Sequence, residues 1–148
     1  MKTHIIIQRE MFDLNGEVAA LAQDGRAGAV ASFTGHVRAE EDLTSLTLEH
    51  YPGMTEAEIG RIAQEAGARW SLTGITVIHR IGALKPGEAI VLVAAAAPHR
   101  TEAFKACEFL MDWLKTRAPF WKQETRGGRT GWVEARSSDK AAAMRWQD

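Results

Sequence analysis

The chain has 148 residues, of which 45% are apolar and 25% are charged, and its formal net charge is -1. This length and composition predict one globular domain, residues 1–148, with enough apolar surface for a hydrophobic core. A nearly neutral chain argues against general binding to nucleic acid or to a membrane surface, because such proteins usually carry a clear basic excess.

The first forty residues alternate between strand and helix patterns. Ile5-Ile6-Ile7 favours a short strand, and the apolar spacing from Phe12 to Asp24 is typical of a helix. Small and β-branched residues over 28–38 predict a second strand. The polar segment Ala39–Asp42 that follows offers no apolar anchor, so we expect a mobile loop.

The middle of the chain continues the mixture. Alternating apolar and polar residues over 43–51 predict a half-buried strand. A helix follows the Pro52-Gly53 turn, with Thr55 as the predicted N-cap. The apolar segments 75–81 and 89–97 read as two strands of a hairpin.

The last third begins with the longest predicted helix, over 101–117, which Pro119 ends because a proline ring cannot join an interior helical turn. A short strand over 131–135 and a final helix over 139–146 complete the chain. Strand and helix segments mix with hairpins, and strict strand–helix–strand crossovers are too few for a doubly wound sheet. This favours an α+β class: an α/β sandwich with a mixed or antiparallel sheet and packed helices.

Basic side chains are concentrated late in the chain. Residues 99–136 hold 8 Lys and Arg against 5 Asp and Glu, whereas residues 1–98 hold 8 against 12. His99 and Arg100 lie where a buried strand meets the long helix, and unpaired amides at such an N-terminus attract phosphate or carboxylate. The alternative is that His99 packs at the strand end and Arg100 pairs with Glu102. The cluster favours an anionic substrate.

Two lysines extend this cluster. Lys115 lies in the last helical turn, where a cation can simply interact with the helix dipole. Lys122 follows the apolar run Pro119-Phe120-Trp121, and an ammonium beside apolar walls loses solvation, which lowers its pKa and suits it to proton transfer or nucleophilic attack. The alternative for both is that they are ordinary surface lysines with buried stems.

Two arginines and one aromatic residue are ambiguous. Arg38 follows a strand and precedes an acidic segment, so it either reaches a substrate or pairs with Glu40 or Glu41. Arg136, just after the 131–135 strand, allows the same two interpretations. Phe33 alternates into the sheet, and we expect it in the core.

Several chemistries find no support in the sequence. Cys107 is the only cysteine, so no internal disulfide can form, and its place on an apolar helix stripe predicts core packing. The histidines lack metal-ligand spacing, and there is no glycine-rich nucleotide loop. We expect no metal and no organic cofactor. The short apolar start and the absence of a run of about 20 apolar residues favour a soluble, cytoplasmic protein.

Several separated blocks together resemble one family, the catalytic (large) subunit of molybdopterin synthase. The blocks are Phe33-Thr34-Gly35-His36-Val37-Arg38, Leu48-Glu49-His50-Tyr51-Pro52-Gly53-Met54, His79-Arg80-Ile81-Gly82, His99-Arg100, Leu114-Lys115-Thr116-Arg117-Ala118-Pro119-Phe120-Trp121-Lys122 and Trp132-Val133-Glu134-Ala135-Arg136. They agree with the family in order and spacing from about Gly28 to Trp146.

The resemblance implies a hammerhead-type, MoaE-like fold and a sulfurtransferase of molybdenum cofactor biosynthesis. The family moves sulfur from the C-terminal Gly-Gly thiocarboxylate of a small ubiquitin-like subunit to cyclic pyranopterin monophosphate, which forms the dithiolene of molybdopterin. It implies a heterotetramer, in which a homodimer of large subunits carries a small subunit at each end. By the same resemblance, Lys115 and Lys122 are the catalytic lysines. The implied substrate-pocket residues are Arg38, His99, Arg100 and Arg136, with the His-Arg pair supplied by the neighbouring protomer.

Two other functions stay open from the sequence. The chain could be a dimeric module that docks a ubiquitin-like tail or a phosphorylated metabolite without turnover, in which case binding would survive loss of Lys115. It could also bind single-stranded RNA through Trp113, Trp121 and Trp132, although the net charge argues against that function.

Overall fold

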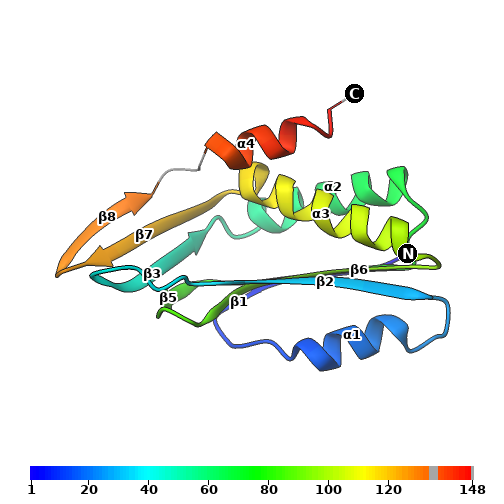
Figure 1. Ribbon diagram of the computed structural model, residues 1–148, viewed down its shortest axis with the longest axis horizontal. Coiled ribbons are helices and arrows are strands. Elements are labelled where there is room, and N and C mark those ends of the chain that lie inside the picture. The colour runs from blue at the N-terminus through cyan, green and yellow to red at the C-terminus, as the bar shows by residue number, and fades with distance from the viewer. Residues whose placement is uncertain (134–136, 148) are drawn as a thin grey trace.

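The computed structural model describes residues 1–133 and 137–147, and this part of the chain forms two four-stranded sheets and four helices (Figure 1). In chain order the elements are β1 (Lys2–Gln8), α1 (Leu14–Ala22), β2 (Ala29–His36), β3 (Leu43–His50), α2 (Met54–Arg69), β4 (Gly74–Arg80), β5 (Gly82–Leu84), β6 (Ala89–Ala97), α3 (Arg100–Arg117), β7 (Phe120–Arg126), β8 (Arg129–Val133) and α4 (Ser137–Met144). The α+β prediction is confirmed. No helix in these residues is long and apolar enough to cross a membrane.

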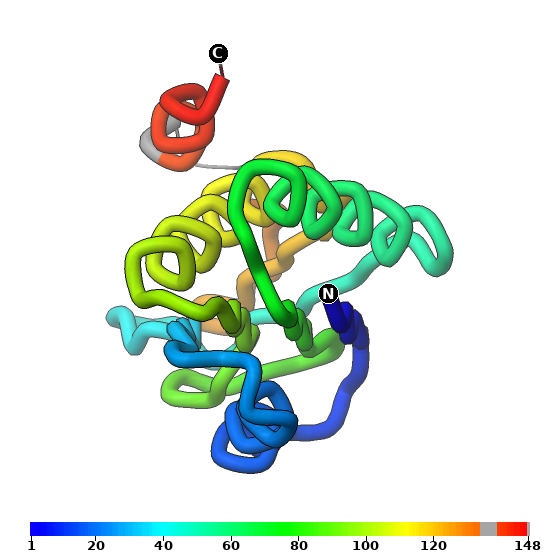
Figure 2. Tube along the Cα trace, turned by 90° about the vertical axis from the view of Figure 1, so that its right-hand side faces the viewer, coloured from blue at the N-terminus to red at the C-terminus, as the bar shows by residue number. Residues whose placement is uncertain are grey.

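The first sheet has the strand order β1-β4-β6-β2 and is mixed, because β1 runs parallel to β4 while the other neighbours are antiparallel. Helix α1 covers one face, and α2 and α3 cover the other, as Figure 2 shows from the side. The central strands β4 and β6 are therefore buried on both faces. This explains their continuous apolar sequences, which differ from the alternation of a strand with one wet face.

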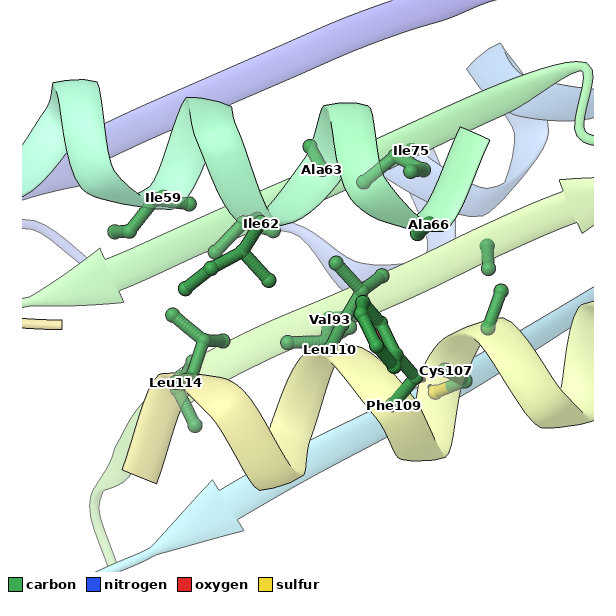
Figure 3. Close-up of a cluster of buried hydrophobic side chains, with 14 residues drawn as sticks. Ile59, Ile62, Ala63, Ala66, Ile75, Val93, Cys107, Phe109, Leu110 and Leu114 are labelled. Carbon is green, nitrogen blue, oxygen red and sulfur yellow. Dashed lines mark hydrogen bonds between the residues drawn. The ribbon is translucent and has the colours of Figure 1, made fainter. Parts of the chain in front are cut away.

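The main core lies between α2, α3 and the first sheet. Figure 3 shows apolar side chains from all three gathered in one cluster, among them Ile62, Val93 and Phe109. These three are fully buried, and burying an aliphatic or aromatic side chain of this kind contributes about 1.5–3 kcal/mol. The apolar side chains that the helix and strand patterns place on one side of each element thus pack together in one layer.

The second sheet has the order β5-β3-β7-β8 and is antiparallel throughout. Its short strand β5 interrupts the predicted hairpin. Strands β4 and β6 do pair antiparallel, but the chain between them first crosses to the second sheet, where Leu84 lies opposite Leu46. Gly82 makes the required bend with a φ of +88°, a conformation that favours glycine.

Strand β7, like β5, is an element that the sequence patterns did not predict. The helix α3 ends at Arg117, Ala118 is extended, and the chain enters β7 directly after Pro119. The strand pairs with β3 so that Lys122 lies opposite Leu48. The sequence of β7 is polar and does not have a strand pattern, but the strand is stabilised by hydrogen bonds to β3 on one edge and to β8 on the other.

Thr55 does not cap α2 as predicted. It lies inside the first turn and is fully buried, and Gly53 occupies the N-cap position. The Thr55 hydroxyl donates to the Pro119 carbonyl at 3.0 Å and accepts from the Tyr51 amide at 3.1 Å. It therefore joins the start of α2 to the turn between α3 and β7.

The segment Ala39–Asp42 was expected to lack anchors, but charged contacts hold it. Arg126 of β7 binds the Glu40 carboxylate, and its Nη1 lies 3.3 Å from Asp42 Oδ1. The same guanidinium binds Glu124 at 2.6 Å. These bonds lower the pKa of Glu40, chiefly through its hydrogen bond to Arg126. A long-range contact thus replaces the local apolar anchor that the segment lacks.

Candidate active site

A pocket of about 530 Å³ opens where the two sheets meet beside the C-terminal end of α3. Strands β2, β4 and β6 of the first sheet contribute to its walls, as do β3 and β7 of the second. The pocket therefore lies between the two sheets, and strands of both form its walls.

Three basic side chains line this pocket. Lys115 comes from the last turn of α3, Lys122 from β7, and Arg38 from the segment after β2. Lys115 is exposed and Lys122 is half-buried. The turn at Pro119 brings the two lysines to one cavity, since it reverses the chain between the helix that carries the first and the strand that carries the second.

Arg38 combines both interpretations that the sequence allowed. It lines the pocket, and its Nη2 also lies 3.5 Å from Glu40 Oε1. Its side chain is 70% exposed, so this ion pair is weak and easily exchanged for another anion. Glu40 is held at the same time by Arg126. Because Arg126 alone can hold Glu40, the Arg38 side chain can leave this ion pair and turn toward a ligand.

Apolar side chains form much of the pocket's surface. Phe33, Met111, Leu114 and Phe120 all line it. The expectation that Phe33 is a core residue is wrong: it is 41% exposed and faces this cavity. The pocket therefore combines apolar surface suited to a ring system with cations suited to anionic groups.

His79 is a pocket residue that the sequence analysis did not single out as functional. It lies near the end of β4, is buried, and stacks on the Phe120 ring with the centroids 3.8 Å apart and the planes 18° from parallel. Its Nδ1 bonds to the Arg80 carbonyl at 2.8 Å. Burial, together with the smaller effect of the nearby Lys122 and Lys115 charges, lowers the pKa of His79 to about 3, although the hydrogen bond to the Arg80 carbonyl opposes this shift. In the sequence, His79 stands in an apolar strand and in one of the blocks that resemble the family, but the resemblance assigns it no role.

His99 and Arg100 do not reach this pocket. His99 is the N-cap of α3 and Arg100 its first residue, both exposed, at the opposite end of the helix from Lys115. Fifteen residues of helix separate Arg100 from Lys115, a rise of about 22 Å. The predicted pairing of Arg100 with Glu102 is not among the ion pairs of residues 1–133 and 137–147. Arg136 lies outside the described residues.

An exposed aromatic surface adjoins the lysine pocket. Phe120, Trp121, Lys122, Trp132 and Val133 line a second, shallower depression. The Trp121 ring meets Trp132 edge-on at 6.4 Å, and Trp132 is 67% exposed. This surface belongs to β7 and β8, so it is continuous with the wall that carries Lys122.

The third tryptophan of the RNA-binding hypothesis is not part of that surface. Trp113 packs edge-on to Phe109 at 6.5 Å and under the Arg117 guanidinium. The three rings therefore offer no common stacking platform. Over residues 1–133 and 137–147, no three His, Cys, Asp or Glu side chains come together as a metal site.

Several known proteins are similar to this chain. The model of the family described as MoaE protein matches residues 7–117. A protein of Mesorhizobium japonicum named molybdopterin synthase catalytic subunit is 61% identical over 95% of this chain and 91% of its own length. The protein of that name from Escherichia coli is 49% identical over 98% and 99%.

Solved structures give the same result. The molybdopterin biosynthesis MoaE protein from Burkholderia ambifaria superposes with a TM-score of 0.85 at 51% identity, covering 97% of each chain. A molybdopterin synthase from Staphylococcus aureus superposes with a TM-score of 0.80 at 30% identity, covering 86% of this chain and 95% of its own.

Proposed function

The chain belongs to the MoaE protein family, and from this premise we propose that it transfers sulfur from a protein thiocarboxylate to cyclic pyranopterin monophosphate. It is an enzyme, the catalytic subunit of molybdopterin synthase, and acts in molybdenum cofactor biosynthesis. The observation that carries the sulfur-transfer proposal is the meeting of Arg38, Lys115 and Lys122 in one partly apolar pocket.

Both reactants of this transfer are anions. Two unit charges 4 Å apart repel by about 4 kcal/mol at an effective dielectric constant of 20. Three cations around the pocket offset that repulsion and stabilise negative charge that develops on sulfur and oxygen during the transfer. A pocket of this charge suits two negatively charged reactants better than a neutral metabolite.

We assign separate roles to the three cations. Lys115, the more exposed lysine, lies at the thiocarboxylate and promotes sulfur attack. Lys122 assists proton transfer or holds the opened substrate, and Arg38 exchanges Glu40 for the phosphate. Each transfer replaces one carbon–oxygen bond of the pterin with a carbon–sulfur bond. The carbon–sulfur bond of the donor tail breaks by hydrolysis, so that water supplies the oxygen of the resulting carboxylate, and the displaced pterin oxygen leaves on its phosphate or as water. None of these steps calls on a metal or an organic cofactor.

The donor is a small ubiquitin-like subunit whose C-terminal Gly-Gly tail enters the pocket. The exposed aromatic surface supports this role, because Trp121 and Trp132 lie on the strands that lead to Lys122. A solved complex of subunits 1 and 2 of molybdopterin-converting factor from Helicobacter pylori has the same fold as this chain, with a TM-score of 0.74 at 20% identity.

A second copy of the chain completes the site in this proposal. His99 and Arg100 are about 22 Å along α3 from Lys115, so within one chain they cannot act on the same substrate. Both are exposed and available to a neighbour. Dimerisation with a small subunit at each end gives the heterotetramer, and Arg136 joins the substrate-binding residues on the basis of the resemblance alone.

We place the reaction in the cytoplasm. Cys107, the only cysteine, is buried and unpaired, and burial raises the pKa of its thiol to about 11. The fold therefore uses no disulfide, in keeping with a reducing compartment.

The test is product formation from purified components. The chain is incubated with a thiocarboxylated small subunit and the cyclic pyranopterin, and mass spectrometry looks for a product that has gained two sulfurs. Lys115→Ala and Lys122→Ala should each lower the rate by about 10²–10³, the effect of losing one transition-state contact. Lys85→Ala is the matched control, an exposed lysine on the turn before β6 and away from the pocket.

Near-normal dithiolene formation in both lysine variants would refute the assigned roles. If the small subunit binds the wild-type chain but the pterin gains no sulfur, the hypothesis of a non-catalytic docking module replaces this proposal.

A further inference from the structure

His79 lies in the lysine pocket with one ring nitrogen already committed. A carbonyl oxygen only accepts hydrogen bonds, so the 2.8 Å contact with the Arg80 carbonyl requires the hydrogen to be on Nδ1. The stacked Phe120 ring holds the imidazole plane. In the neutral ring Nε2 then carries a lone pair and acts as an acceptor.

Burial keeps His79 in this neutral form, and the charges that face it act in the same direction. Lys122 of β7, Lys115 of α3 and His50 of β3 all disfavour a further positive charge on the ring. The Arg80 side chain on the same strand is engaged elsewhere: its Nε donates to the Arg9 carbonyl and its Nη1 to the Ala89 carbonyl, both at 3.0 Å. An imidazolium here would add a buried charge beside two ammonium groups.

The pocket offers His79 Nε2 as an acceptor beside several groups of other kinds. Asp139 and Thr34 also line it, and so does His36, whose ring nitrogens already contact the Gly87 carbonyl and the Thr34 hydroxyl. Arg38, Lys115 and Lys122 can only donate hydrogen bonds. Glu40 and Glu124 line the pocket as acceptors, but both are bound to Arg126. A phosphate or a thiocarboxylate is an acceptor at neutral pH and gains nothing from a bare imidazole nitrogen. The N–H groups on the edge of a pterin ring are donors and do.

We propose that Nε2 of His79 accepts a hydrogen bond from a pterin N–H and so fixes which way the substrate ring enters the pocket. The ring then lies on the apolar surface near Phe120 and Leu114, while its phosphate points toward Arg38 and the lysines. This inference rests on the proposed function and extends it by identifying His79 as the residue that orients the substrate.

The kinetic test compares two substitutions. His79→Phe keeps a ring that can stack on Phe120 but removes Nε2, and His79→Gln returns an amide oxygen near the Nε2 position. We expect His79→Phe to raise KM for the pterin about tenfold, the worth of one hydrogen bond, with kcat and small-subunit affinity close to wild type. His79→Gln should recover much of that loss. A merely structural role would instead lower stability, kcat and small-subunit binding together.

The second test needs no turnover and uses the wild-type chain. NMR of isotope-labelled histidine nitrogens should show Nε2 of His79 unprotonated at neutral pH, and this resonance should move when the pterin alone is added. A protonated Nε2, a resonance unmoved at saturating pterin, or an unchanged KM in His79→Phe would each overturn the inference. Failure of the proposed function is a separate result: with the wild-type chain the pterin gains no sulfur, although the His79 resonance responds to the pterin.

Discussion

Thr55→Val isolates the contact that joins α2 to the turn between α3 and β7. The substitution keeps the shape of a fully buried side chain but removes the hydroxyl. The Pro119 carbonyl then loses its donor and the Tyr51 amide its acceptor, at 3.0 Å and 3.1 Å respectively. Two hydrogen bonds at about 0.5–1.5 kcal/mol each predict a loss of about 1–3 kcal/mol in the free energy of unfolding.

Urea denaturation measures this loss, and Thr44→Val is the matched control. Thr44 is exposed, and its hydroxyl donates to the Thr125 carbonyl at 3.1 Å, so water can replace the lost bond. We expect the control to change the free energy of unfolding by less than about 0.5 kcal/mol. Equal stability of the two variants would refute the argument that the buried hydroxyl, rather than threonine shape, fixes this junction.

The same variant tests whether the junction positions the site. Lys122 is three residues beyond Pro119 on β7. If the turn holds that strand in register, Thr55→Val lowers kcat/KM even where the protein is fully folded, because small displacements of a reacting group are costly. Activity equal to that of Thr44→Val under folding conditions would show that β7 keeps its place without this bond.

Two further predictions concern buried titratable groups. Burial lowers the pKa of His79 from 6.5 to about 3, so below pH 6.5 the unfolded chain binds a proton that the folded chain does not. This contribution to stability is fully present above pH 6.5 and is lost as the pH falls toward 3, with a limiting slope of about 1.4 kcal/mol per pH unit. Urea denaturation at several pH values should show a steeper acid loss for wild type than for His79→Phe, and parallel curves would contradict it. Cys107, buried and with its pKa raised to about 11, should resist iodoacetamide in the native protein at neutral pH and react only on unfolding, as mass spectrometry would report; rapid native alkylation would count against this.

The periodic elements could be predicted from the sequence because their signals are local. The apolar run of β6 and the helical stripes of α2 and α3 report the burial of neighbouring residues on one element. The cluster of basic residues and the family resemblance likewise depend on residue types and their order. This information sufficed for the α+β class and for the choice of Lys115 and Lys122 as candidates.

Strands β5 and β7 could not be predicted in the same way, because their partners are distant in the chain. The polar segment that forms β7 becomes a strand by pairing with β3, more than seventy residues earlier. The anchor of Ala39–Asp42 is also remote, since Arg126 provides it from β7. Local composition carries no record of such contacts.

The sequence by itself determined which groups this protein can use: an apolar core, a basic second half, and lysines beside a proline that ends a helix. Only the tertiary structure decided which of them meet, by bringing Arg38, His79 and the two lysines to one pocket while leaving His99 and Arg100 at the far end of α3. The physical reason is that periodicity encodes which side of an element is buried, whereas the crossing of two sheets sets which side chains share a cavity.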